Sequence, residues 1–175
     1  MADDLAQIIA DCQVGDRRAQ RRLYERYHRT IYRLAARLVG QGDAADLTQE
    51  VFLRVFARIT SFQGKAAFFT WLYRITVNEC LRHRNRRRQP TESLTEEPLA
   101  ESAGPERVLE QADLLERALD QLDRPLRLAF VLREVEGLSY QEIAQVLEIA
   151  PGTVASQLAR ARASLQAYLR RIEQG

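Results

Sequence analysis

Apolar residues recur at helical spacing along almost the whole of this 175-residue chain, whereas the alternating pattern of strands is nearly absent. Between residues 4 and 39 the spacing predicts two amphipathic helices, separated by a Val-Gly-Asp break at residues 14–16. Helical periodicity returns after each later break in the chain. The sequence therefore predicts an all-α protein.

A second break at residues 40–43 precedes another expected helix, which Asp43 can cap. A loop is expected at residues 61–65 and a long helix from Phe68 to Arg88. This helix ends in a basic cluster formed by Arg82, Arg84, Arg86, Arg87 and Arg88. Like charges packed so closely are unfavourable unless a polyanion lies nearby, which favours contact with a DNA backbone. The alternative is a solubilising helix end that complements the helix dipole.

Residues 91–105 are rich in Thr, Glu, Ser, Pro and Gly and contain few large apolar side chains. Such a segment cannot bury enough apolar surface to repay its ordering entropy. We therefore expect a flexible acidic linker at residues 91–105, between a first small helical domain at residues 1–90 and a second at residues 106–175.

The second domain contains a well-marked helix start. Ser139 can accept a hydrogen bond from an N-terminal backbone N–H while Glu142 reaches back, which is the capping-box arrangement. Ile143 and Leu147 are expected to face inward, and a short corner then leads into a helix that begins at Pro151. The spacing predicts a helix-turn-helix.

The outward face of the last helix is small and basic and carries no acidic residue. It comprises Thr153, Ala155, Ser156, Gln157, Arg160 and Arg162. Such a surface is suited to a DNA major groove. An ordinary helical hairpin with a solvated basic face is the alternative.

Residues 134–144, 151–154 and 160–162 resemble the C-terminal promoter-reading domain of extracytoplasmic-function (ECF) sigma factors. The resemblance implies minus-35 contacts from Thr153, Ser156, Gln157 and Arg160, with Arg162 as a further phosphate contact. Ala155 and Gln157 stand where the family often carries basic residues. We therefore expect weaker or altered minus-35 recognition, which Gln157→Arg should strengthen.

Residues 46–56 and 68–78 are similar to the region-two signatures of the same family. By itself, the polar face of the helix after residue 43 could be merely solvated. The resemblance implies that it binds the clamp helices of the largest subunit of RNA polymerase, through Asp46, Gln49, Glu50 and Arg54. It also implies a pocket that holds a flipped minus-10 base, formed by Phe62, Gln63, Gly64, Lys65 and Asn78. Trp71 is expected to belong to the core.

The resemblance implies a sigma factor that binds core RNA polymerase, recognises the minus-35 and minus-10 elements of promoter DNA and helps to open the duplex. It also implies contact with the polymerase flap and control by an anti-sigma factor. A stand-alone helix-turn-helix regulator that binds duplex sites as a dimer is the rival interpretation.

Other functional classes have little support. His28 and His83 have no matched carboxylate or cysteine partners and no glycine-rich phosphate loop is present, so we expect neither an enzyme nor a cofactor. The spacing of Cys12 and Cys80 argues against a disulfide framework and a metal site. No apolar run approaches the roughly 20 residues that span a bilayer, and the N-terminus is acidic. We expect a cytoplasmic protein without membrane insertion.

Overall fold

The computed structural model describes residues 2–64, 66–88, 114 and 117–174, and every regular element over these residues is helical. The chain divides into two compact units, Met1–Ser93 and Leu94–Gly175. The prediction of an all-α protein with two helical domains is confirmed. The expected linker and the expected start of the second domain at residue 106 lie outside the described residues.

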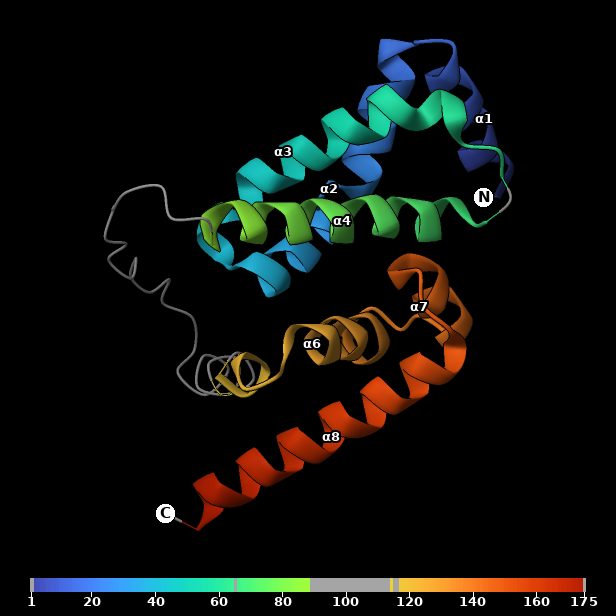
Figure 1. Cartoon of the computed structure of the whole chain (residues 1–175). Coiled ribbons are helices and arrows are strands. Elements are labelled where there is room, and N and C mark those ends of the chain that lie inside the picture. Colours follow the sequence, from blue (N-terminus) through green and yellow to red (C-terminus); the bar gives the residue numbers. More distant parts are fainter. Residues whose placement is uncertain (1, 65, 89–113, 115–116, 175) are drawn as a thin grey trace. The chain divides into compact units, whose positions relative to one another are not determined.

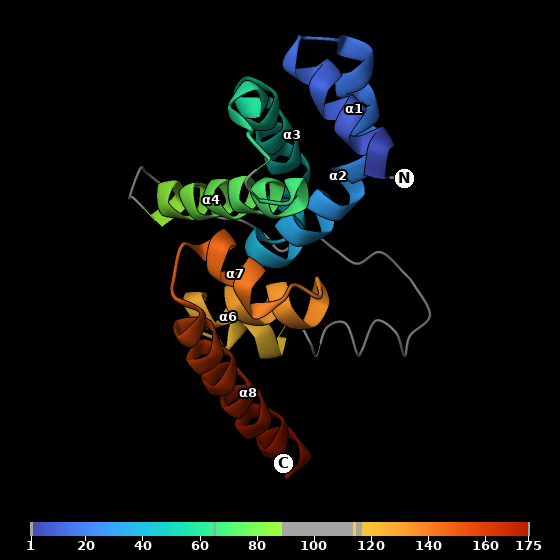
Figure 2. The same ribbon diagram turned by 90° about the vertical axis from the view of Figure 1, so that its right-hand side faces the viewer.

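The first unit is built around one long helix, α2. Its elements are α1 (Ala2–Gln13), α2 (Arg17–Val39), α3 (Gln41–Arg58), the 3-10 turn η1 (Ile59–Ser61) and α4 (Phe68–Arg88). The helix α2 packs on α1, α3 and α4, and α3 also packs on α4 (Figure 1, Figure 2). Fully buried side chains from these helices form the core: Leu23, Ile31, Leu34, Leu47, Leu72 and Tyr73. The bounds of α4 agree with the predicted helix.

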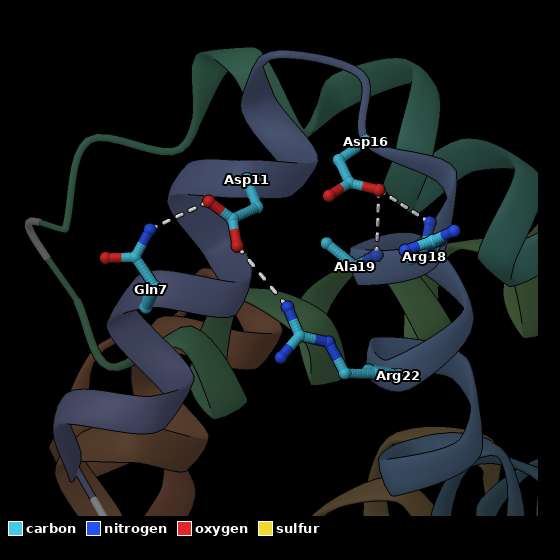
Figure 3. Close-up of polar contacts among 6 residues, drawn as sticks. All are labelled: Gln7, Asp11, Asp16, Arg18, Ala19 and Arg22. Atoms are coloured by element: carbon cyan, nitrogen blue, oxygen red, sulfur yellow. Dashed lines mark hydrogen bonds and ion pairs between the residues drawn. The ribbon is translucent and has the colours of Figure 1, made fainter.

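Short polar contacts fix the turn between α1 and α2 (Figure 3). Oδ1 of Asp16 caps α2 by accepting hydrogen bonds from the backbone N–H groups of Arg18 at 2.7 Å and Ala19 at 3.3 Å. The guanidinium of Arg22 donates to Asp11 at 3.3 Å and so ties α2 back to α1. The predicted break between the two helices is confirmed.

The start of α3 differs from the prediction. Asp43 is not the cap, because α3 begins at Gln41 and its N-cap is Gly40. Gly40 has a φ of 98°, a conformation that glycine adopts without steric cost, and its N–H closes α2 on Ala36 O at 2.9 Å. One glycine thus ends α2 and begins α3. Asp43 lies in the first turn of α3, where its Oδ2 is 2.9 Å from His83 Nε2 on α4. His83 therefore has a carboxylate neighbour, which corrects the expectation for that histidine.

The second unit consists of short helices packed on one long helix. Its elements are α6 (Arg124–Phe130), which continues as the π-helical segment η2 (Val131–Val135), α7 (Tyr140–Leu147) and α8 (Pro151–Glu173). The helix α8 packs on α6 and α7. The inward side of α7 is formed by Ile143 and Val146, while Leu147 is only half-buried, which corrects the prediction for that residue.

Candidate nucleic-acid interface

The helix-turn-helix begins at a complete capping box. The Ser139 hydroxyl oxygen accepts a hydrogen bond from the backbone N–H of Glu142 at 3.2 Å. In return, Oε2 of Glu142 accepts from the backbone N–H of Ser139 at 2.8 Å and from its hydroxyl at 2.7 Å. These hydrogen bonds hold the pKa of the Glu142 carboxyl below its ordinary value. The predicted cap is confirmed.

The capping box predicts a pH dependence of stability. Because the pKa of Glu142 is lowered in the folded state, the stability from these bonds is present above the ordinary value of 4.5 and is lost as the pH falls through the folded value. Ser139→Ala should lower the free energy of unfolding of the second unit by about 1 kcal/mol at neutral pH. It should also make the loss of stability below the ordinary value of 4.5 shallower. Urea unfolding over a pH series measures both, and identical acid dependence in the two proteins would contradict the assignment.

The corner between α7 and α8 is short and well defined. Glu148 takes the left-handed conformation, with a φ of 55°, and closes α7. The N–H of Ile149 donates to Ala144 O at 3.1 Å, and α8 then begins at Pro151. On α8 the inward stripe of Val154, Leu158, Ala161 and Leu165 is buried as predicted. The buried stripe leaves the opposite face of α8 as the outer surface of the helix-turn-helix.

The exposed part of this outer face is smaller than predicted. Thr153, Ala155, Ser156 and Arg160 are exposed. Gln157 is half-buried, and its Oε1 is buried without a hydrogen-bond partner among the described residues. The expectation that Gln157 faces outward is therefore met only in part, and its contact with the minus-35 element stays a prediction. Ala155, two residues earlier on α8, is exposed to solvent.

Arg162 is engaged with the protein. Its Nη2 donates to Glu134 Oε1 at 2.6 Å, across 28 residues of sequence. The hydrogen bond to Glu134, and to a smaller extent one to Tyr140, raises the pKa of the Arg162 guanidinium. Nearby, Arg133 lies over the Tyr140 ring at 5.4 Å and donates to Leu138 O at 2.8 Å. Arg162 thus joins α8 to the segment before α7, and a phosphate must compete with Glu134 for it.

The loop after η1 packs its aromatic residue on α4. The Phe62 ring is half-buried, with centroids 5.4 Å from Phe68 and 5.3 Å from Trp71. Gln63 and Gly64 are exposed, and Gly64 has a φ of 70°. Lys65 lies outside the described residues. Trp71 is buried, as predicted.

A residue that the sequence did not single out holds this loop from behind. The side-chain amide of Gln13, at the end of α1, donates to Ile59 O at 3.1 Å and to Phe62 O at 2.9 Å. No local pattern predicts the contact, because the partners are 46 and 49 residues apart in sequence. Gln13 therefore fixes the backbone on which Gln63 and Gly64 are carried.

Asn78 is exposed on α4. It follows Trp71 by seven residues, which is about two helical turns, so both project from the same face of α4. Since Phe62 packs on Trp71, the loop and Asn78 lie along the same face. The structure is consistent in this respect with one shared pocket for a base.

The outward face of α3 is polar and open. Asp46, Gln49, Glu50 and Arg54 are all exposed, whereas the opposite side of α3 is buried. A large apolar residue, Leu53, lies among them with 69% of its surface exposed, which no sequence pattern indicated. A groove of about 700 Å³ between α2 and α3 includes Gln49 in its wall. Isolated exposed leucines are common. An apolar side chain surrounded by polar ones is also the arrangement found in protein–protein interfaces.

Of the arginines at the basic end of α4, two bind other groups of the first unit and a third is exposed to solvent. Arg82 donates to Glu79 Oε1 at 3.0 Å, and Arg84 donates to Leu38 O at the end of α2 at 3.0 Å. Arg86 is exposed. The side chains of Arg87 and Arg88 lie outside what the structure describes. Two of the five predicted backbone-binding arginines thus also bind within the first unit, and Arg84 links α4 to α2.

Over the described residues, no helix is long and apolar enough to cross a bilayer, and no three acidic, histidine or cysteine side chains form a candidate metal cluster. Cys12 and Cys80 are free and buried. Burial raises the pKa of the Cys80 thiol to about 12. A thiol with such a pKa is a poor nucleophile at neutral pH.

The second unit is a capped helix-turn-helix, and the first is a helical unit with an aromatic loop. Together they are typical of an all-helical, DNA-binding transcription factor with two domains. The family model "Sigma-70 region 2" matches residues 23–89, and the model "Sigma-70, region 4" matches residues 112–165. The chain is 34% identical over 172 residues to the ECF RNA polymerase sigma-E factor of Escherichia coli (strain K12), with 90% of each chain covered. It is also 34% identical over 182 residues to the sigma-E factor of Haemophilus influenzae, covering 95% of this chain and 96% of the other.

Two solved structures have the same fold. CnrH in complex with the cytosolic domain of CnrY matches with a TM-score of 0.72 at 28% identity, covering 94% of this chain and 96% of that one. The sigma factor RpoE of Bartonella quintana, in complex with the anti-sigma factor NepR, matches with a TM-score of 0.65 at 26% identity, covering 86% and 96%. The chain belongs to the ECF family of sigma factors and is a promoter-recognising sigma factor for RNA polymerase.

Proposed function

We propose that the second unit reads the minus-35 element through α8, with Thr153, Ser156 and Arg160 as its contacts. The observation that carries this proposal is the sidedness of α8, whose inner stripe is fully packed while these residues are exposed and no acidic side chain stands among them. Arg162 adds a phosphate contact when DNA draws it away from Glu134. Gln157, which is half-buried, is a further candidate contact on the same helix.

In the first unit, the proposed minus-10 pocket consists of the loop from Phe62 to Lys65 together with Asn78. The Asn78 amide offers a donor and an acceptor to a base edge, and the Phe62 ring lies on the same face of α4. The basic end of α4, formed by Arg82, Arg84, Arg86, Arg87 and Arg88, then follows the DNA backbone. The exposure of Gln63, Gly64, Asn78 and Arg86 supports these roles, which come from the family resemblance.

Core RNA polymerase binds both units in this proposal. The exposed face of α3 with Asp46, Gln49, Glu50 and Arg54 docks on the clamp helices of the largest subunit. In the second unit, an apolar groove of about 390 Å³ that is lined by α6, α8 and the residues Leu114 and Ala118 receives the flap. Leu114, Phe130, Leu165 and Leu169 form much of its wall. Leu114 and Leu169 keep 37% and 40% of their surface exposed, and such apolar side chains at a groove suit a protein partner.

Reconstituted transcription tests these assignments together. Purified protein with core polymerase should give specific transcripts from a library of genomic promoters and protect both promoter elements. The protein acts by binding, without a catalytic step of its own, and does so in the cytoplasm. If the protein alone protected duplex operators and gave no transcript with core polymerase, a stand-alone regulator would be the better description.

We also propose that a dedicated protein inhibitor controls this factor. The neighbouring solved structures are complexes, one with the cytosolic domain of CnrY and one with the anti-sigma factor NepR. Affinity capture of the full chain from its native cells should return one small protein besides the polymerase subunits. That protein should compete with core polymerase for the chain, and recovery of polymerase subunits alone would contradict the proposal.

Ala155→Arg should strengthen minus-35 binding. Position 155 is exposed on the outer face, and one added phosphate contact should steepen the dependence of log affinity on log salt by about one. This substitution replaces Gln157→Arg as the informative one, because Gln157 is half-buried. Holoenzyme binding to a promoter fragment over a salt series measures the slope. The control is Ala163→Arg, which adds the same charge about two turns further along α8, and equal slopes for the two variants would contradict the assignment.

A further inference from the structure

One carboxylate in the first unit is buried and was not identified from the sequence. Glu79 lies on α4 with only 3% of its surface exposed. A buried carboxylate is costly unless charges and hydrogen bonds compensate it. Its Oε1 lies 3.0 Å from Arg82 Nη1, one turn further along α4, and 3.6 Å from Arg54 Nε on α3. Two guanidinium groups from different helices therefore share one oxygen.

Both arginines keep about half of their side-chain surface in solvent, 46% for Arg54 and 49% for Arg82. A guanidinium has five N–H donors in a rigid planar fork, so a bond to Glu79 leaves further donors for an outside partner. An arginine that is already held in place loses less rotamer entropy when it binds. The buried carboxylate thus restrains two groups that remain able to bind.

The same end of α4 is fixed by two other contacts. His83 Nε2 lies 2.9 Å from Asp43 Oδ2 on α3, and Arg84 donates to Leu38 O on α2 at 3.0 Å. The Arg84 hydrogen bond ties this end of α4 to α2, and the packing of α4 on α3 places Glu79 beside Arg54. The Glu79 carboxylate therefore has a defined place relative to Arg54 on α3 as well as to Arg82 on its own helix.

We infer that Glu79 is a positioning residue that orients Arg54 towards core polymerase and Arg82 towards the DNA backbone. This inference rests on the proposed roles of the two arginines and adds a residue that touches neither partner. One buried group then supports two separate surfaces, one on α3 and one on α4. Loss of its charge affects polymerase affinity through Arg54 and promoter affinity through Arg82.

Double-mutant cycles on the full chain test this role. Glu79→Gln keeps the size of the side chain and removes its charge, so it should weaken core binding and holoenzyme binding to promoter DNA by about three- to tenfold each. In an Arg82→Ala background, the same change should leave promoter affinity unaltered. In an Arg54→Ala background it should leave core affinity unaltered. Core affinity is measured by titrating labelled protein with core polymerase. Promoter affinity is measured with core polymerase that is saturated by each variant.

The matched control removes another carboxylate that pairs with an arginine. Glu25 accepts from Arg21 at 2.8 Å on the exposed surface of α2, and Glu25→Gln should change neither affinity. A second variant covers the case in which Glu79→Gln does not fold. Arg82→Lys keeps the positive charge but lacks the planar fork, and it should still weaken promoter binding by about threefold or more.

The outcomes separate this inference from the proposed function. If Glu79→Gln weakened promoter binding as strongly in the Arg82→Ala background as alone, it would act through the fold and the positioning role would be wrong. Arg82→Lys with wild-type promoter affinity would also overturn it. If Arg54→Ala left core affinity unchanged and Arg82→Ala left promoter affinity unchanged, the proposed roles of the arginines would fail, and the positioning role with them.

Discussion

Replacing Asn78 by Ala should slow the formation of open promoter complexes by about ten- to hundredfold, which corresponds to the loss of a good bidentate contact to a base. The side chain is exposed on α4, on the face where Phe62 packs on Trp71. Ala is also the better helix former, so the first unit should be as stable as the wild type or slightly more so. A loss of function with no loss of stability is the signature of a residue that contacts its ligand.

Permanganate reactivity of unpaired promoter thymines measures the opening rate, and thermal unfolding measures stability. Gln7→Ala is the control, because it removes an amide side chain from an exposed position on α1, away from α4. The control should open promoters at the wild-type rate. Normal opening by the Asn78→Ala holoenzyme, at saturating concentrations of the factor, would exclude Asn78 from the minus-10 pocket.

Leu158→Ala should unfold the second unit near 37 °C and leave the first unit folded. Leu158 is fully buried on α8, and truncation of such a leucine costs about 2 to 5 kcal/mol. A domain this small has only a few kcal/mol of stability to lose. Transcription that depends on the minus-35 element should disappear, while residual binding to core polymerase through α3 remains.

Circular dichroism during heating should show two transitions for this variant, with the lower one belonging to the second unit. Ala163→Ser, at an exposed position of the same helix, should leave the curve unchanged. Because the two units have separate cores, the upper transition should stay where it is in the wild type. A single lowered transition for the whole chain would show that the units unfold as one.

Local signals accounted for much of the fold. The helix from Phe68 to Arg88 could be predicted because its apolar spacing is long and its ends are marked by a loop and a basic cluster. The capping box at Ser139 could be predicted because both of its partners lie within four residues. The start of α3 could not, since an Asp near a helix start is a common cap and the positive φ of Gly40 becomes visible only in the structure.

The candidate site was less accessible to sequence reasoning, because its side chains are arranged by contacts between helices. Spacing on one helix cannot show that Arg84 reaches a carbonyl of α2 or that Arg162 pairs with Glu134. It also suggested that Gln157 was open, whereas packing in the second unit buries its Oε1. Residue types and faces were predictable, but the inward contacts of the charged residues depend on partners far away in sequence.

The hydrogen bonds from Gln13 to the loop after η1 have a practical meaning for protein engineering. They couple α1 to the loop, because the side-chain amide at the end of α1 donates to the backbone carbonyls of Ile59 and Phe62. The two segments should therefore be exchanged together between relatives. In a chimaera that takes the loop from a relative but keeps this α1, the Gln13 amide would face backbone carbonyls that differ in position from Ile59 O and Phe62 O. Transplanting promoter preference between relatives should therefore succeed more often when residues 2–13 and 59–64 move together.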